Sequence, residues 1–213
     1  SFEINDIPLI RYVAKKHKPM IISTGVADLD DIQLALDTCY KEGNYDISLL
    51  KCTSEYPATY EKANLLTIPD MNHRFGIPVG VSDNTMGSLV PIVAVSLGAT
   101  IVEKHFILSR TNGGPDSAFS MEPNEFREMV DSIRNVERAL GNVKYDITDY
   151  QRGKRRSLYA RTDIHCGDVF TDQNVGSYRP GVGLSPQYWD QIMGKTCKRE
   201  IVKGDVLRQE DLK

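Results

Sequence analysis

The chain has 213 residues, of which 40% are hydrophobic and 26% are charged, and its formal net charge is −3. These values are those of a soluble globular protein with a sizeable core, and they count against a nucleic-acid-binding protein, which needs a basic face. No apolar run is long enough to cross a bilayer, and the first residues do not resemble a signal peptide. The four cysteines are scattered and include no Cys-x-x-Cys pair, which predicts reduced cytoplasmic thiols rather than a zinc site.

Segments with helical periodicity alternate with short apolar runs of strand length through the first two-thirds of the chain. Glycines at 43 and 141 follow two of the helical segments, as is typical of helix C-termini. In chain order we predict a helix at 7–17, a strand at 19–25, a helix at 28–42, a strand with its exit loop at 46–57, a helix at 65–75, a strand at 76–82, a helix at 89–97, a strand at 100–108 and an amphipathic helix at 123–140.

This alternation predicts an α/β fold with a parallel sheet. The nearly all-apolar strands favour a (β/α)8 TIM barrel, in which helices cover the outside and side chains fill the inside. A whole barrel has eight strands and needs about 250 residues, and only four strands are predicted here. Because half a barrel leaves two long unpaired edges, we expect this segment to be about the last four strands of a longer enzyme.

The composition changes after residue 142. Residues 145–156 are polar and are expected to be a linker between a barrel domain at 1–144 and a small β-rich domain at 157–213. The last segment has short strand-like runs separated by turn signals, and 188–193 can form one or two helical turns.

Polar residues stand at the ends of consecutive predicted strands: Ser-Asp-Asn-Thr at 82–85 and Glu-Lys-His at 103–105. Because ligands collect at the carboxyl ends of parallel strands, these residues suit a site for an anion beside a divalent metal. Small hydroxyl groups at several strand ends can converge on one anion, and the candidates are Ser1, Ser23, Ser54 and Ser82.

Each candidate residue also has an ordinary structural explanation. A serine at a strand end is usually a turn or cap residue, and Asn84 can hydrogen-bond its own backbone in a turn. A lone histidine such as His105 is more often structural than a metal ligand. Glu3 can be a solvent-facing terminal residue, and chain ends fray unless they are tied down.

The order and spacing of several segments resemble the sialic acid synthases, and within them the pseudaminic acid synthase subgroup. The tail resembles the antifreeze-like (SAF) domain of the same enzymes, so the resemblance covers essentially the whole chain. The run at 116–120 is the part that favours the pseudaminic subgroup. The segments are 1–3, 22–25, 51–57, 81–85, 103–106 and 113–120, with 178–184 and 194–195 in the tail.

The resemblance implies an enzyme that condenses phosphoenolpyruvate with a 2,4-diacetamido-trideoxy-hexose, giving pseudaminic acid and phosphate. Carbon 3 of phosphoenolpyruvate would attack the sugar aldehyde, and water would add at carbon 2. This chemistry needs an electrophile on the aldehyde oxygen, a positioned water and donors around the phosphate. An N-acetylneuraminate or legionaminate synthase is an alternative within the family. A non-catalytic fragment acting as a binding or dimerisation module is an alternative of another class.

The resemblance also implies roles for individual residues and a divalent metal, with Mn²⁺ as the expected ion. The implied roles are catalysis for Glu3; phosphoenolpyruvate binding for Ser1, Ser23, Ser54 and Ser82; sugar binding for Tyr56, Asp116 and Arg179; and metal binding for His105 and Asn84.

Two of these residues carry further consequences. Family members commonly have a second metal-binding histidine where this chain has Asn84, and an amide oxygen binds a cation more weakly than an imidazole nitrogen does. Arg179 matches an arginine that reaches the partner subunit's site, which implies a homodimer with an active site shared between two chains. Gly-Gly-Pro-Asp116 and Arg179-Pro-Gly are equally compatible with ordinary surface turns.

Overall fold

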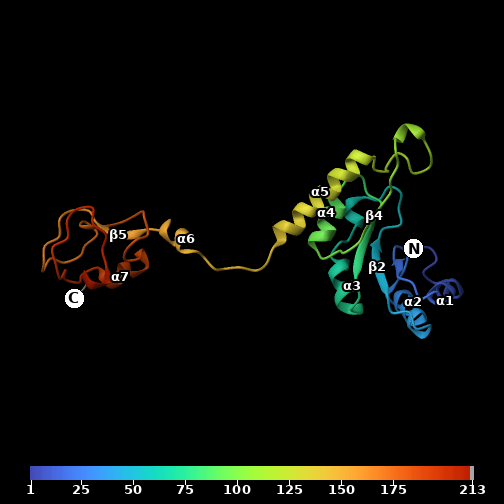
Figure 1. Ribbon diagram of the computed structural model, residues 1–213, viewed down its shortest axis with the longest axis horizontal. Coiled ribbons are helices and arrows are strands. Elements are labelled where there is room, and N and C mark those ends of the chain that lie inside the picture. The colour runs from blue at the N-terminus through green and yellow to red at the C-terminus, as the bar shows by residue number, and fades with distance from the viewer. Residues whose placement is uncertain (212–213) are drawn as a thin grey trace. The chain divides into compact units, whose positions relative to one another are not determined.

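The structure, a computed structural model, describes residues 1–211 (Figure 1). The chain divides into two compact units, Ser1–Asn142 and Val143–Lys213. Within residues 1–211, no helix combines the length and the apolar character that a membrane span requires. Each unit has its own hydrophobic core.

The first unit is an α/β structure built on a parallel sheet with the strand order β1-β2-β3-β4. Its strands and helices alternate along the chain, so it has the predicted architecture of half a (β/α) barrel. The elements are α1 (Ile7–Ala14), β1 (Met20–Ser23), α2 (Leu29–Lys41), β2 (Ile47–Cys52), α3 (Thr67–Phe75), β3 (Val79–Asp83), α4 (Leu89–Ser96), β4 (Val102–Lys104) and α5 (Pro123–Leu140).

The two faces of the sheet have different roles. One face packs against helices α1 to α4 and forms the main core, to which the strands contribute Met20, Ile47, Leu49, Val79 and Val81. Side chains alternate between faces along a strand, so the residues between these point the other way. The register pairs Cys52 with Ser82 and Ser82 with Glu103, which places these three on that second face at the carboxyl ends of their strands.

Strand β4 is much shorter than the predicted strand at 100–108. It covers only Val102–Lys104, opposite Val81–Asp83 of β3. The physical reason is that β3 ends at Asp83, so the residues after Lys104 have no neighbouring strand to pair with on that side. Phe106 instead forms a single bridge with Met121 on the returning loop.

The loop between β4 and α5 is tied down by Arg110. Its backbone N–H donates to the Glu122 carboxylate at 2.8 Å, and its guanidinium donates to the Ser120 carbonyl and the Glu125 carboxylate. Glu122 and Glu125 also form a capping box at the start of α5, where negative charge is favoured by the helix dipole. These bonds fix the loop that carries Asp116 and Phe119.

The second unit has a two-stranded antiparallel sheet of β5 (Ser157–Ala160) and β6 (Val175–Tyr178). Single bridges extend it, and its core surrounds the fully buried Phe170. A short helix, α7 (Trp189–Ile192), follows a 3-10 turn where one or two turns were predicted. The expected linker contains helix α6 (Asp149–Gly153), because Thr148 and Gln151 form a capping box.

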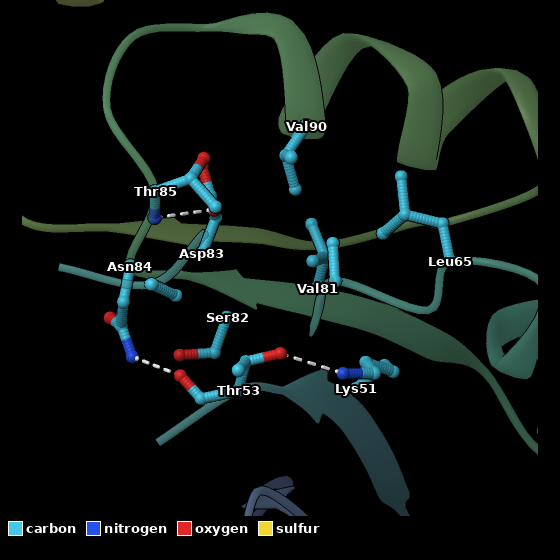
Figure 2. A pocket seen from close by; sticks show the side chains of 11 residues that line it. Lys51, Thr53, Leu65, Val81, Ser82, Asp83, Asn84, Thr85 and Val90 are labelled. Carbon is cyan, nitrogen blue, oxygen red and sulfur yellow. Dashed lines mark hydrogen bonds between the residues drawn. The ribbon is translucent and has the colours of Figure 1, made fainter. Parts of the chain in front are cut away.

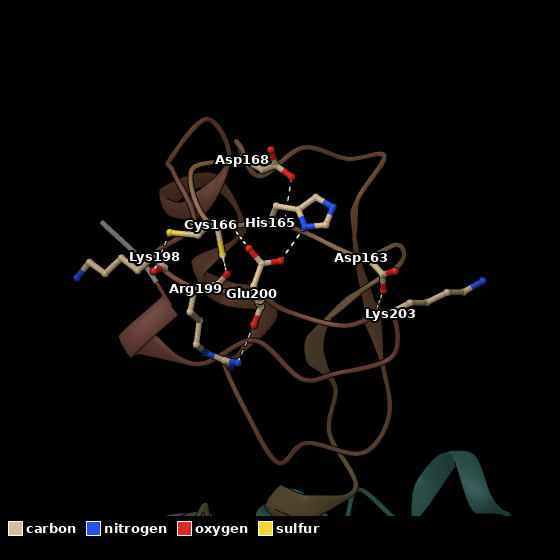
Figure 3. Close-up of polar contacts among 9 residues, drawn as sticks. Asp163, His165, Cys166, Asp168, Lys198, Arg199, Glu200 and Lys203 are labelled. Carbon is tan, nitrogen blue, oxygen red and sulfur yellow. Dashed lines mark hydrogen bonds and ion pairs between the residues drawn. The ribbon is translucent and has the colours of Figure 1, made fainter.

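A polar cluster on the second unit joins two loops around Glu200 (Figure 3). One carboxylate oxygen lies 2.7 Å from Nδ1 of His165, and the other accepts the backbone N–H of Cys166 at 2.9 Å. Hydrogen bonding to Glu200 and its charge raise the pKa of His165 above its ordinary value of 6.5. The Cys166 N–H and then the His165 side chain lower the pKa of Glu200 below 4.5.

Replacing Glu200 by glutamine is expected to bring the pKa of His165 back down, as followed by NMR titration of its ring protons. A raised pKa means that His165 contributes to stability below pH 6.5 and loses that contribution as the pH rises through its folded pKa. The depressed pKa of Glu200 means that its contribution is lost as the pH falls through that folded pKa. Glu137→Gln on α5 serves as a control that should leave His165 unaffected. An unchanged titration in Glu200→Gln would contradict the prediction.

Candidate active site

Four serine side chains converge beneath one buried thiol at the carboxyl end of the sheet. The Ser1 and Ser23 hydroxyl oxygens are 2.7 Å apart, and the backbone N–H of Gly25 donates to Ser1 at 3.2 Å. Ser54 Oγ lies 3.9 Å from Cys52 Sγ, and Ser82 is the register neighbour of Cys52 on β3. The structure therefore brings together all the serines that were predicted to share an anion.

The pKa of the Cys52 thiol indicates that this cluster favours negative charge. Burial raises its pKa, but hydrogen bonds from the Ser23, Ser82, Ser1 and Ser54 hydroxyls outweigh burial, and the pKa falls below its ordinary value of 9.0. Hydroxyl groups that stabilise a thiolate at one point can stabilise another anion there for the same reason. Sequence reasoning missed Cys52 as part of this site, because its neighbours come from β1, β3 and the loops.

A second group of predicted residues lines an adjoining pocket of about 230 Å³. Ser82 belongs to both groups, because it is part of the serine cluster and also lines this pocket. Its hydroxyl donates to the Glu103 carboxylate, another lining residue, at 2.7 Å. The serine cluster and this pocket therefore lie side by side, as the strand-end pattern predicted. The pocket is lined by Ser82, Asn84, Glu103, Lys104 and His105.

Asn84 is almost completely buried and does not make the local turn bond that was its alternative explanation. Its amide nitrogen donates to the Thr53 carbonyl at 2.9 Å, across to the loop after β2 (Figure 2). The local bond is made by Asp83 instead, whose carboxylate accepts the backbone N–H of Thr85 at 2.9 Å. Because the amide nitrogen of Asn84 is committed to Thr53, its carbonyl oxygen is the group that can face a ligand.

His105 lies among three residues that reach it from two loops. Its Nδ1 is 3.6 Å from a carboxylate oxygen of Asp116. Its ring packs edge-on against Phe119, at 4.9 Å between centroids, and against Tyr56, at 5.8 Å. The structure therefore places two predicted sugar-binding residues, Tyr56 and Asp116, beside the predicted metal ligand.

Ser1 and Glu3 lie just before α1, and the idea that they follow the end of a strand stays a prediction, since that strand would precede residue 1. Residues 1–5 form a turn, and Glu3 is exposed. The Ser1 hydroxyl nevertheless reaches Ser23, and Glu3 lines a pocket of about 230 Å³ together with Ser1 and Ser23 along the edge strand β1. Glu3 thus borders the serine cluster but does not line the His105 pocket.

Arg179 belongs to the second unit. There it lines a pocket of about 390 Å³ with Arg161, Lys203 and two tyrosines, Tyr159 and Tyr178. The tyrosine rings pack edge to face, and the Tyr159 hydroxyl donates to the Pro180 carbonyl at 2.8 Å. Three cations and two aromatic faces give this pocket the character of a site for an anionic or hydroxylated ligand.

The donors in the His105 pocket fit a divalent ion that takes only part of its ligands from the protein. An imidazole, an amide oxygen and the Glu103 carboxylate line one space, and such N and O donors suit Mn²⁺. Across residues 1–211, no group of three or more His, Cys, Asp or Glu side chains is arranged to hold a metal alone. Water or substrate oxygens would have to complete the coordination.

Comparison with known proteins finds relatives for both units of the chain. The model of the NeuB family matches residues 1–145, and that of the SAF domain matches residues 155–213. The chain is 41% identical over 216 residues to the pseudaminic acid synthase of Campylobacter jejuni and, over the same length, 41% identical to that of Helicobacter pylori. All of this chain is covered in both cases, but only 63% and 64% of those proteins. The chain also matches the solved structure of the spore coat polysaccharide biosynthesis protein SpsE from Bacillus subtilis, with a TM-score of 0.64 and 32% sequence identity. This match covers 100% of this chain and 66% of the SpsE chain.

Proposed function

The chain belongs to the NeuB family and carries a SAF domain, and from this premise we propose that the full-length protein is a pseudaminic acid synthase. It would condense phosphoenolpyruvate with a 2,4-diacetamido-trideoxy-hexose, releasing phosphate. The similarity to two proteins named pseudaminic acid synthase supports this choice of product. Because the chain spans about 63% of the length of such relatives, the activity is proposed for the longer protein.

The observation that carries the proposal is the serine cluster beside the His105 pocket. Hydroxyl groups of Ser1, Ser23, Ser54 and Ser82 would donate to the phosphate of phosphoenolpyruvate, and Ser82 would turn its single O–H away from the Glu103 carboxylate to do so. Ser82 lies at the boundary between the two spaces. A phosphate bound there would hold the rest of phosphoenolpyruvate next to whatever occupies the His105 pocket, and this proximity is what a condensation needs.

The sugar would lie on the His105 side. Asp116, whose side chain is about half exposed, can accept hydrogen bonds from sugar hydroxyl groups, and the Tyr56 ring can pack against the sugar face. Glu3 would accept or donate the proton of the water that adds to carbon 2. In the proposed homodimer, Arg179 of the partner subunit would complete the sugar site.

His105 and Asn84 would hold the divalent ion, proposed to be Mn²⁺. When bound, the ion would supply the electrophile that polarises the aldehyde oxygen. The proposal is supported by the contacts that fix both side chains: Phe119 and Tyr56 pack on the His105 ring, Asp116 lies near its Nδ1, and Asn84 is bonded to Thr53. The four cysteines are free thiols, which supports the proposed cytoplasmic location.

The decisive experiment incubates the full-length protein with phosphoenolpyruvate, Mn²⁺ and each candidate hexose, and measures phosphate release and the keto-acid product. We expect release with the pseudaminic acid precursor. Release only with the N-acetylneuraminate or legionaminate precursor would assign the alternative substrate. No release with any acetamido sugar would reject the synthase and leave the non-catalytic binding or dimerisation module, which the asparagine at position 84 motivates.

A further inference from the structure

A buried ion pair lies directly behind the proposed active site and has no part in the proposed chemistry. Lys104 Nζ is 2.6 Å from a carboxylate oxygen of Asp83, and each side chain is only 1% exposed. Lys104 also donates to the Thr85 carbonyl, while the second oxygen of Asp83 accepts the Thr85 N–H at 2.9 Å. The pair therefore joins the end of β4 to the segment that follows β3.

The pair and the site occupy opposite faces of the same two strand ends. Asp83 is the register partner of Lys104, and Ser82 is that of Glu103. Side chains alternate along the strand, so Ser82 points away from Asp83. Figure 2 shows Asp83 and Thr85 directed toward Val90 of α4, whereas Ser82 and Asn84 point toward Thr53. The two charged side chains thus face the helix layer, the proposed ligands face the pocket, and Lys104 is the residue of the pair that also borders that pocket.

The hydrogen bonds of this pair fix the backbone on both sides of Asn84. Asp83 is the residue before Asn84. Thr85, the residue after it, is held through its N–H by Asp83 and through its carbonyl by Lys104. Lys104 immediately precedes His105. A buried ion pair is weak evidence for stability, because desolvating two charges offsets much of their attraction, but it can specify one geometry.

We infer that Asp83 and Lys104 are positioning residues, which set the distance between Asn84 and His105 by locking the two strand ends together from behind. As far as it concerns metal binding, this inference rests on the proposed function. It is independent of that function as far as it concerns the orientation of His105. The sequence offers no sign of this role, since the pair is formed only by the register of β3 on β4.

The test uses the neutral double variant Asp83→Asn/Lys104→Met in the full-length protein. We expect the affinity for Mn²⁺, measured from the EPR signal of the free ion, to fall about tenfold, the size typical of losing support behind metal ligands. Binding of inorganic phosphate should change by less than about twofold, because the serine cluster is held by other contacts. The NMR resonance of the His105 ring, assigned with a His105→Asn variant, should shift, while that of His73 should not.

The matched control is Arg199→Met/Asp211→Asn, which removes a 2.6 Å pair with a fully buried carboxylate from the second unit. It should leave the Mn²⁺ affinity and the His105 resonance as they were. An unchanged Mn²⁺ affinity and an unchanged His105 resonance in the Asp83/Lys104 double variant would overturn the inference. If this double variant does not fold, the same readouts on Asp83→Asn/Lys104→Gln, which leaves no buried charge unpaired and keeps polar groups at both positions, decide in the same way. If the unsubstituted protein binds no Mn²⁺, the proposed metal role fails, and the His105 resonance alone still decides the inference.

Discussion

Replacing Gly25 by alanine is expected to remove most of the affinity of the full-length protein for inorganic phosphate and phosphoenolpyruvate. A Cβ at this position would lie 2.9 Å from Ser1 Oγ and 3.1 Å from Cys52 Sγ, and it would overlap Ser54 Oγ. The hydroxyl groups must turn away, and the anion loses their hydrogen bonds. Bonds to charged groups contribute roughly 1.5–3 kcal/mol each, so losing one or two should weaken binding by about tenfold or more.

Isothermal titration with inorganic phosphate measures this loss directly. Gly153→Ala is a suitable control, because a Cβ at Gly153 meets no atom within 4 Å and the residue lies in the short helix α6. Both variants should unfold at temperatures close to that of the unsubstituted protein. If Gly25→Ala bound phosphate as tightly as the control, the serine cluster would not be the anion site.

Replacing His105 by alanine is expected to lower the affinity for Mn²⁺ by on the order of 100-fold and to lower phosphate release accordingly. The imidazole is the only nitrogen ligand among the residues that line the pocket, since the other proposed ligand there, Asn84, offers an amide oxygen. Without the imidazole, the ion would keep only the Asn84 amide oxygen and the Glu103 carboxylate as protein donors, and two such oxygens hold a divalent ion more weakly than the full set. Phosphate binding at the serine cluster should be nearly unaffected.

The Mn²⁺ affinity is measured by EPR and the activity by phosphate release in the same preparation. His73→Ala is the control, because His73 is exposed on α3 and lines none of the pockets near the site. An undiminished Mn²⁺ affinity in His105→Ala would remove this residue from the proposed metal site. Loss of phosphate binding along with Mn²⁺ binding would instead indicate that the site had collapsed as a whole.

Local patterns predicted the secondary structure well where one element's own residues decide it. Helix α5 has the predicted bounds of 123–140, because Pro123 suits a first helical turn and Gly141 suits the residue after the last. The predicted strand at 100–108 was too long, because a strand ends where its partner ends. The serine prediction rested on the same parallel-sheet geometry that the structure shows, although Ser1 lies in a turn and not in a strand.

By itself, the amino-acid sequence determined the alternation of helices and strands, the half-barrel, and which polar residues stand at the strand ends, since these follow from periodicity and from the end of each apolar run. Only the tertiary structure decided which of those residues touch. Cys52 enters the serine cluster, Asn84 bonds to Thr53, and Lys104 pairs with Asp83, because the register of neighbouring strands and the course of their exit loops set these distances. Register depends on contacts between segments tens of residues apart, which no local pattern encodes.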